Sequence, residues 1–540
     1  MAKKQLHTDS QNLPACVAEF IQQVVKKMRY RRKVRLDVQA ELAAHFEDEL
    51  RGCTTGEERE QKARQLIAEF GDVKLLAVLL RRAKKRCRPI WQKALVRSVQ
   101  ALGIVFVYFL ICLSPMIVGS PTIIVNYVDW LNELVQAGRD EADNARPYYE
   151  KAAQLYAKTP DGLAARPTEW SADLNDIELD LLADWLEDNK GAIEALRQGS
   201  GCPGYWGKYQ GDETKLSKDL VANAMEILPS YRRLAFAIQW QIRYEAYKGD
   251  IEKAFGDCVA LAKFGGHLHG NGLLIEQLVG IALEALAHNT IFMLLERDDA
   301  PVDVLRSTQQ ELDKLFNTQE PIFSMDAEKV FWYDGIQRSF TDDGKGSGRL
   351  LVRGLAYVVT DDWVDNLWRF ISFNYPDRQE MVEKIDRYFK GFDEFLGQTP
   401  LDLRDKDIDE QQWDQNTNIA SMMLKILIPA HKRVRQIAWR TKTSRRALLT
   451  VLAILRYEKQ IGRYPAGLNE LVKAGYLKKM PIDPYSDSPL VYRRTEDEFL
   501  LYSFGSNFKD DGGKLGLGRN GKPTMWADDG DWVFWPPLKS

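Results

Sequence analysis

In the first 92 residues, apolar side chains recur every three or four positions, which is the spacing of one helical face. Residues 16–28 and 34–50 each carry such a stripe, and a third stripe ends at Phe70, where Gly71 can terminate the helix. The short apolar stretch VKLLAVLL follows. This pattern predicts a compact cytoplasmic bundle of three or four helices over residues 1–92.

An uncharged run then extends from Ser98 to Val128, with ALGIVFVYFLICLSPMIVGSPTIIV at its centre. A helix that crosses a bilayer needs about 20 mainly apolar residues, so this run is long enough. Pro115 is expected to kink or end the helix, and Pro121 to prevent its continuation. The run starts too far along the chain for a cleaved signal peptide, whose apolar core lies within about the first 30 residues. We predict one transmembrane segment within residues 93–128; the alternative is a buried core helix.

The charges on the two sides of this run differ in sign. Residues 1–97 hold 22 Lys+Arg and 12 Asp+Glu, a net charge of +10. Since the net charge of the whole chain is −3, the remaining residues carry a net charge of −13. The basic residues next to the run are Arg81, Arg82, Lys84, Lys85, Arg86, Arg88, Lys93 and Arg97. The positive-inside rule places this end in the cytoplasm and residues after about 128 outside. We predict a bacterial inner-membrane protein whose basic cluster meets anionic headgroups, and we expect no nucleic-acid partner.

Two stretches of the N-terminal part, RRKVRLDVQAELAAHFEDEL and EEREQKARQLIAEFGDVKLLAVLL, resemble the helical module of permease-prefix and HAAS-type signalling proteins. The resemblance covers about 75 residues, and the matching positions are His45, Glu47, Asp48, Glu49, Gly71 and Asp72. It implies an interaction module or a membrane-associated regulatory module. We interpret His45 as a half-exposed helix residue rather than a metal ligand.

Residues 129–440 are predicted to be mostly helical. DLLADWLEDNKGAIEAL and YRRLAFAIQWQIRYEAY, among others, place apolar residues at helical spacing, as helices in a bundle or solenoid do. No reliable repeat period is present, and we predict a solenoid-like α-helical domain. The aromatic-rich stretches YWGKYQGDE and FWYDGIQRSF indicate either a domain core or a ligand groove.

The stretch GGHLHGNG raises the possibility of a metal site in this domain. It contains His267 and His269, with His288 further along, and imidazoles are good ligands for transition metals. The glycines favour a turn between helices instead, and alternate residues of a helix point to different sides. His288 lies in an Ala- and Leu-rich helix, where a hydrogen-bonded core histidine is the ordinary case.

The cysteines are compatible with the predicted topology. Cys16, Cys53, Cys87 and Cys112 fall in the cytoplasm or the membrane, where thiols stay reduced. Cys202 and Cys258 fall on the oxidising side, so a disulfide between them is allowed. The sequence does not show whether their geometry permits one.

Residues 441–540 have a different character. An amphipathic helix ends at GRYP, a short helix AGLNELVKAG follows, and LVYRR and EFLLYS alternate like the strands of a hairpin. The last predicted strand is DWVFW. This order predicts a small α+β domain after mainly α-helical regions.

The C-terminal part resembles the globular domain of the type II secretion major pseudopilin over about 95 residues. The matching positions are Tyr457, Gly462, Tyr464, Pro465, Gly467, Leu468, Gly475, Tyr476, Leu477, Pro481, Asp483, Pro484, Tyr502, Ser503 and Gly505. The chain departs from that family in having about 97 residues before its apolar run and over 300 residues between that run and the C-terminal helix. An ordinary pilus subunit is therefore excluded, and a pseudopilin-like domain joined to a membrane-anchored scaffold is expected.

The resemblance implies a calcium ion in the acidic loop that begins at NFKDDGG. The candidate oxygen donors are Asp510, Asp511, Asp528, Asp529 and Asp531. Gly512 and Gly513 permit a sharp turn. The inserted KLGLGRNGKPTMW lengthens the loop, and a solvated polar loop without calcium is the alternative.

No nucleophile elbow, P-loop, zinc signature or dinucleotide fingerprint occurs, so we predict no catalytic residue and no enzyme activity. We expect a binding or scaffolding protein of the cell envelope, linked to secretion or signalling. Its expected partners are the inner membrane, other envelope proteins or a second copy of itself. The alternatives are an envelope hydrolase with its site in the helical domain, and a ligand sensor.

Overall fold

The structure, a computed structural model, describes residues 13–86, 90–121, 123–163, 176–210, 218–270, 272–318, 321–341, 348–351, 377–404, 422–495, 498–518 and 520–538. It is mainly helical, with a small strand region near the C-terminus, which confirms the predicted mainly α class. The chain divides into two compact units, Met1–Leu113 and Ser114–Ser540.

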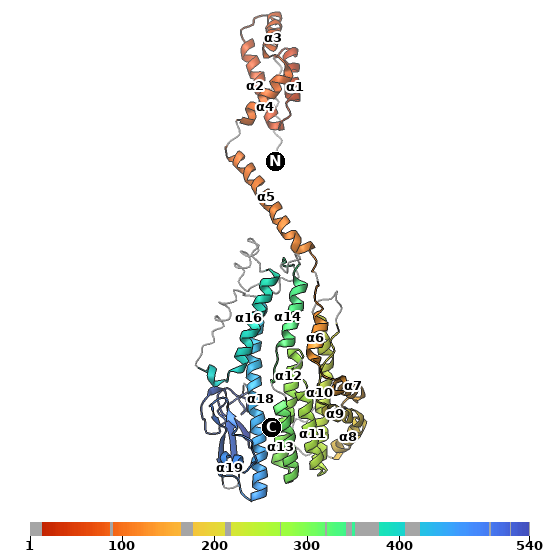
Figure 1. The fold of residues 1–540 in the computed structure, drawn as a ribbon. Helices are drawn as coiled ribbons and strands as arrows, with labels where there is room; N and C mark the ends of the chain where they lie inside the picture. Colours follow the sequence, from red (N-terminus) through yellow and green to blue (C-terminus); the bar gives the residue numbers. More distant parts are fainter. Residues whose placement is uncertain are drawn as a thin grey trace. The chain divides into compact units, whose positions relative to one another are not determined.

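The first unit opens with a four-helix bundle, as the apolar periodicity predicts (Figure 1). Its helices are α1 (Ala15–Lys27), α2 (Arg32–Leu50), α3 (Gly56–Phe70) and α4 (Val73–Arg86). The predicted stripes form the core, which consists of Val17, Phe20, Ile21, Val24, Met28, Val38, Leu42, Phe46, Leu50, Ala63 and Ala77. Every one of these core residues lies between positions 17 and 77, so the bundle encloses a core of its own.

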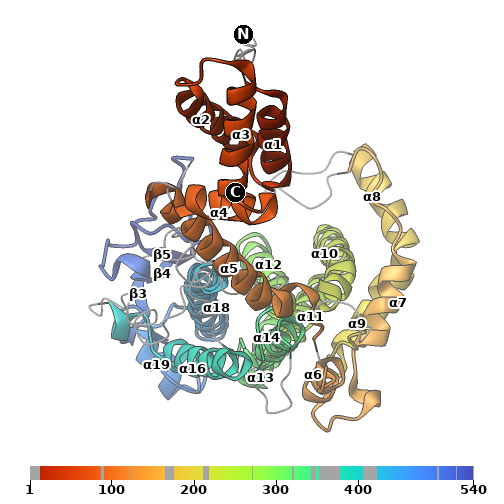
Figure 2. The same cartoon turned by 90° about the horizontal axis from the view of Figure 1, so that it is seen from above.

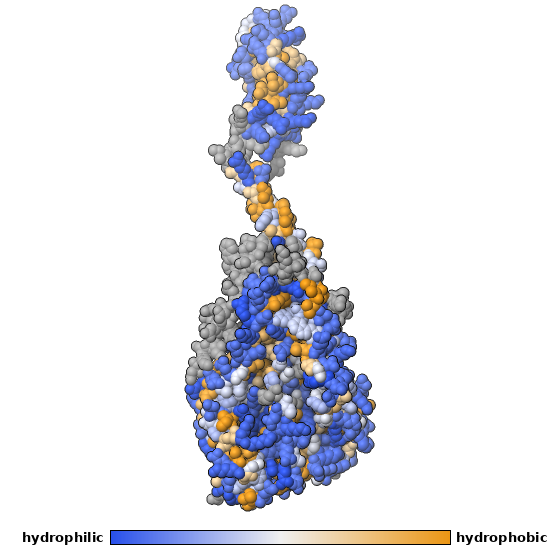
Figure 3. All heavy atoms as spheres, viewed as in Figure 1, coloured by the Kyte–Doolittle hydropathy of each residue, from blue (hydrophilic) through white to orange (hydrophobic). Residues whose placement is uncertain are grey.

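The predicted membrane segment forms α5 (Ile90–Val118). We expected Pro115 either to kink the helix or to end it. The helix continues through Pro115, so the expectation that this proline ends it is wrong. Helix α5 ends three residues before Pro121. Only 6% of the span Ala94–Val118 is buried, and its apolar side chains are visible along the helix in Figure 3. By length and composition α5 is able to cross a membrane, and so is one further helix, α12 (Leu274–Arg297).

The second unit is built from long helices, several of which are seen end-on in Figure 2. In chain order they are α6 (Tyr127–Gln136), α7 (Arg146–Leu155), α8 (Asp176–Asp188), α9 (Lys190–Ser200), α10 (Lys218–Tyr247), α11 (Ile251–Gly266), α12, α13 (Val302–Thr318), α14 (Asp326–Ser339), α16 (Arg378–Gly397) and α18 (Met422–Ile461). Helix α11 packs against α9, α10, α12 and α13, and α18 packs against α12 and α13. A solenoid-like arrangement stays a prediction.

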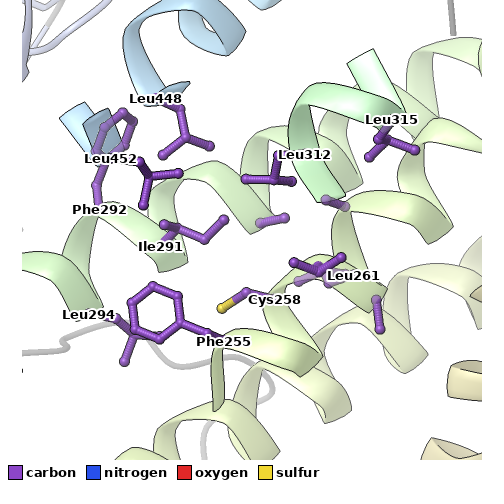
Figure 4. Packing of buried hydrophobic residues seen from close by; sticks show 14 of the residues in the cluster. Phe255, Cys258, Leu261, Ile291, Phe292, Leu294, Leu312, Leu315, Leu448 and Leu452 are labelled. Carbon is purple, nitrogen blue, oxygen red and sulfur yellow. The ribbon is translucent and has the colours of Figure 1, made fainter. Parts of the chain in front are cut away.

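Helix α12 lies in the main core, with 67% of its apolar span buried. Figure 4 shows side chains of four helices meeting there: Phe255 and Cys258 from α11, Ile291 from α12, Leu312 from α13, and Leu452 from α18. Cys258 is fully buried in this core, and both Cys202 and Cys258 are free thiols in the structure. The disulfide that the sequence allows is not formed here.

The C-terminal region contains the predicted hairpin and last strand. Its elements are α19 (Leu468–Lys473), β1 (Ile482–Asp483), β2 (Ser488–Pro489), β3 (Val491–Arg494), β4 (Phe499–Ser503) and β5 (Trp532–Trp535). Strands β3, β4 and β5 form an antiparallel sheet in that order. Phe534 of β5 lies against Phe292 of α12, with ring centroids 6.5 Å apart, so the sheet shares the core of the helical region.

Candidate functional site

Asp510 lies at the edge of the sheet, where protein donors hold its carboxylate. The Tyr502 hydroxyl donates to Asp510 at 2.7 Å, the Arg493 guanidinium at 3.2 Å, and the Gly512 backbone N–H at 2.9 Å. The Tyr502 hydrogen bond is the main cause that lowers the pKa of Asp510. The first predicted calcium ligand is therefore charged and already well supplied with donors.

Asp531 is the buried member of the predicted set. Its carboxylate accepts the backbone N–H of Gly513 at 2.6 Å and that of Asp511 at 3.3 Å. A Cβ at Gly513 would come within 2.4 Å of the Leu500 side chain, and φ there is +82°, so this turn requires glycine. Burial raises the pKa of Asp531, and the charges of Asp511 and Asp510 raise it further. The structure thus brings Asp510, Asp511 and Asp531 into electrostatic contact.

The other two predicted ligands have partners of their own. Asp528 accepts a hydrogen bond from the Ser506 hydroxyl at 3.1 Å and lies 3.6 Å from the Arg440 guanidinium. Asp529 accepts the backbone N–H of Leu517 at 3.1 Å. Within the described residues, no three His, Cys, Asp or Glu side chains are grouped as a metal site would need. The loop is closed by N–H and O–H donors, and calcium binding stays a prediction.

The GGHLHG turn forms part of a second candidate site. Glycines allow α11 and α12 to approach closely at this point, because a Cβ at Gly265 would lie 2.6 Å from the backbone nitrogen of Glu284. The turn that follows α11 carries His269 against Gly280 of α12, whereas His267 faces Tyr149 of α7. The two histidines have different surroundings, as their spacing of two residues predicts.

Both ring nitrogens of His267 are used within the protein. Its Nε2 donates to the Cys202 carbonyl at 3.1 Å, so its Nδ1 accepts a hydrogen bond from the Tyr149 hydroxyl at 2.7 Å. Burial lowers the pKa of His267 to about 4, so the ring is neutral at physiological pH. A metal ion would have to displace one of these two partners.

His269 and His288 flank a fully buried carboxylate, Glu284. Arg445 of α18 forms a bidentate pair with Glu284 at 2.6 and 2.8 Å, and the same guanidinium lies 3.1 Å from Nδ1 of His269. Nδ1 of His288 lies 3.0 Å from the Ser444 hydroxyl, and its Nε2 lies 3.3 Å from Glu284. The guanidinium thus serves as the cation of this cluster, which ties α18 to α12.

The electrostatics of this cluster are decided by burial and by Arg445. Burial alone would raise the pKa of Glu284, but the charge and hydrogen bonds of Arg445 outweigh it and hold that pKa at about 2. Burial lowers the pKa of both His269 and His288 to about 4. The cluster therefore consists of one ion pair between two neutral imidazoles.

A cavity of about 420 Å³ opens beside the turn. Its wall comes from the end of α6, the segment before Tyr205, the turn after α11, and the start of α14. The polar side chains on that wall are Arg139, Tyr205, His267, His269, Thr318, Ser324 and Asp326. This volume is in the range of small-molecule sites, which are typically about 300–1,000 Å³.

Arg139 is the cation on the cavity wall. Its guanidinium lies over the Trp206 ring, 4.9 Å from the centroid, and donates to the carbonyls of Gln136 and Val135. Among the described residues no carboxylate forms an ion pair with it. Burial lowers the pKa of Arg139, yet an arginine remains charged at physiological pH. A half-buried, positioned cation of this kind suits a ligand with a carboxylate or phosphate group.

The hydroxyl groups on the wall make local contacts. The Ser324 hydroxyl donates to Asp326 at 2.8 Å, and the Thr318 hydroxyl donates to the Lys314 carbonyl at 3.1 Å. Neither hydroxyl hydrogen-bonds to His267 or His269 in the described part of the chain, so neither is paired with a histidine that could act as its base.

The sequence pointed to this region only through the two histidines and the aromatic stretch around Trp206. Tyr205, Trp206 and Tyr209 are buried, so they belong to the core, although Tyr205 also lines the cavity. Arg139 carried no signal beyond being a lone basic residue after the apolar run. Comparison of the chain with family models, curated proteins and solved structures gives no match.

Proposed function

We propose that the chain is a single-pass protein of the bacterial inner membrane that acts in the envelope as a binding or scaffolding protein. The observation that carries this proposal is the exposure of α5, of which only 6% of the apolar span Ala94–Val118 is buried. At 1.5 Å per residue its 25 residues extend about 38 Å, longer than the roughly 30 Å hydrocarbon core of a bilayer. Lipid would remove this apolar surface from water.

The orientation follows from charge. Eight Lys and Arg residues lie between positions 81 and 97, just before the apolar run, and this basic flank favours a cytoplasmic bundle and an external location for residues after about 128. The link to secretion or signalling depends on the two family resemblances and is proposed on that ground alone.

A reporter fusion tests the anchor and its orientation together. Alkaline phosphatase, which folds only outside the cytoplasm, is fused after Ser540 in one fusion protein and after residue 88 in another. We expect activity in the first only, with the full chain resistant to alkaline extraction of membranes. Extraction into the soluble fraction, or activity in the second fusion, would contradict the proposal.

Small-ligand binding is the second candidate function, and the cavity with Arg139 favours it. A ligand sensor fits this observation better than the hydrolase alternative, because the described wall lacks a paired nucleophile and base. Thermal unfolding of residues 123–540 in a panel of small carboxylates and phosphates tests it, since a ligand of the folded state raises its stability. Arg139→Gln should abolish any shift. Arg233→Gln, a change at an exposed guanidinium on α10, should keep it.

A further inference from the structure

Helix α4 has apolar side chains on two opposite faces. Val73, Leu76, Ala77 and Leu80 point into the bundle, at the spacing of one helical face. Leu75, Val78 and Leu79 lie on the opposite face, where they are 60%, 44% and 51% exposed. Only one other large apolar residue of the described bundle, Leu36, is exposed to this degree. The bundle therefore covers one side of α4 and leaves an apolar stripe on the other.

This exposed stripe runs into positive charge. Arg82 continues it seven positions after Leu75, and Arg81 and Lys85 are exposed beside it. The helix sequence VKLLAVLLRRAKKR contains no acidic residue. One basic residue of α4, Lys84, is paired with Glu41 of α2 and faces the bundle. The exposed face is thus apolar in its first half and basic in its second.

We propose that this face of α4 binds the surface of an anionic lipid bilayer. The apolar stripe would lie among the upper acyl chains, and Arg81, Arg82 and Lys85 would contact lipid phosphates, as in interfacial amphipathic helices. Charge decides between this partner and a second copy of the chain. Two such faces packed in parallel would bring basic residues near one another with no acid on the same helix to offset them, and in an antiparallel pair the basic half of each helix would cover the apolar half of the other.

Chain connectivity favours the same partner. Only three residues separate α4 from α5, and eight steps along the chain separate Arg86 from Ala94, where the apolar span begins. Eight steps of extended chain reach at most about 28 Å, so the end of α4 lies near the membrane wherever α5 enters it. This step uses the proposed anchor, but the binding of the face itself can be tested without α5.

The test uses residues 1–86, which enclose the core of the bundle. Circular dichroism first establishes that the fragment is folded. Co-sedimentation then compares vesicles of phosphatidylglycerol and phosphatidylcholine with vesicles of phosphatidylcholine alone. We expect binding to the anionic vesicles that weakens as salt is added. Each basic residue removed, as in Arg81→Gln or Arg82→Gln, should weaken it about fivefold. The double variant Leu75→Gln, Leu79→Gln should lose binding to these vesicles.

Leu36→Gln is the matched control for the apolar stripe, because Leu36 is equally exposed but lies on α2. It should bind like the parent fragment. If the folded fragment does not bind anionic vesicles, the proposal is wrong, whether or not α5 anchors the protein in the membrane. Dimerisation of the fragment that the Leu75→Gln, Leu79→Gln variant abolishes would assign the face to a second copy. Tighter binding to DNA than to vesicles would assign it to nucleic acid.

In the full chain, hydrogen exchange in lipid nanodiscs provides the second measurement. Amides of α4 should exchange more slowly in anionic than in neutral nanodiscs, while those of α3 should be unaffected. Equal exchange of α4 in both lipids would contradict the proposal even if the isolated bundle binds vesicles.

Discussion

Helices α5 and α12 satisfy the same criteria of length and apolar composition for a membrane span, yet they differ in burial, 6% against 67%. The difference lies in their polar residues. Helix α12 contains Glu276, Glu284 and His288, and each is buried with partners from other elements. Helix α5 has no charged residue from Ser98 to its end. In this chain the helix that is mostly buried is also the one whose ionisable groups have partners on other elements, as is typical of a core helix.

The largest expected effect comes from placing arginine in each helix. Ile291→Arg puts an unpaired charge at a fully buried position of α12, which should prevent residues 123–540 from folding. Phe106→Arg, at an exposed position of α5, should leave residues 123–540 folded. It should make the insertion of α5 into the membrane less favourable by about 2.5–3.5 kcal/mol. Protease resistance and alkaline extraction of membranes measure the two effects separately. If Phe106→Arg unfolded the second unit, α5 would be a core helix.

The next effect concerns the ion pair that joins α12 to α18. Arg445→Met leaves the Glu284 carboxylate buried without its cation, and we expect residues 123–540 to lose about 3–5 kcal/mol of unfolding free energy. Urea unfolding measures this loss. The double variant Glu284→Leu, Arg445→Met should recover much of it, since no charge then remains buried. Arg306→Met, which removes a surface ion pair with Asp303, should change stability by less than about 1 kcal/mol.

Failure of the double variant to recover stability would mean that the pair contributes more than its desolvation costs. Little loss in Arg445→Met would mean that water reaches Glu284, against its full burial in the structure.

A more gradual effect should appear as pH falls. The folded-state pKa values of His267, His269 and His288 lie near 4, below the usual 6.5, because the rings are buried. The unfolded chain therefore takes up their protons first as pH falls. Their contribution to stability is full above pH 6.5 and is lost between pH 6.5 and 4, at up to about 1.4 kcal/mol per pH unit for each ring.

Urea unfolding at a series of pH values measures this slope. His267→Gln should reduce the slope of unfolding free energy against pH by the contribution of one histidine ring. The control is His45→Gln in the full chain, at an exposed position of the bundle. Glu284 adds a separate loss below pH 4.5, because its folded pKa of about 2 lies below the usual value. An unchanged slope in His267→Gln would show that this ring is not buried as a neutral group.

The sequence predicted helices and strands well where one face of an element is buried, because burial imposes a period. The bundle stripes of Phe20 and Phe46 and the hairpin of β3 and β4 are examples. It did not predict the Glu284–Arg445 pair, whose members are 161 positions apart, since opposite charges at that separation carry no pattern. It also missed Arg139, which becomes part of a site only when α6, the α11 turn and α14 enclose a cavity.

The smallest expected effect concerns the acidic loop, in which Asp531 is buried but Asp510 is exposed, in contrast to the fully buried Glu284. Our calcium proposal expects residues 123–540 to be stabilised by about 1.4 kcal/mol when calcium is tenfold above its dissociation constant, compared with chelator. The physical reason is the mutual repulsion of Asp510, Asp511 and Asp531, which contributes to the raised pKa of Asp531 and which a cation would relieve. Asp510→Ala with Asp511→Ala should abolish the shift in thermal unfolding. Asp303→Ala, at an exposed carboxylate on α13, should keep it. If millimolar calcium produces no shift, Tyr502, Arg493 and the backbone N–H groups suffice to hold these carboxylates, and the loop is a polar turn.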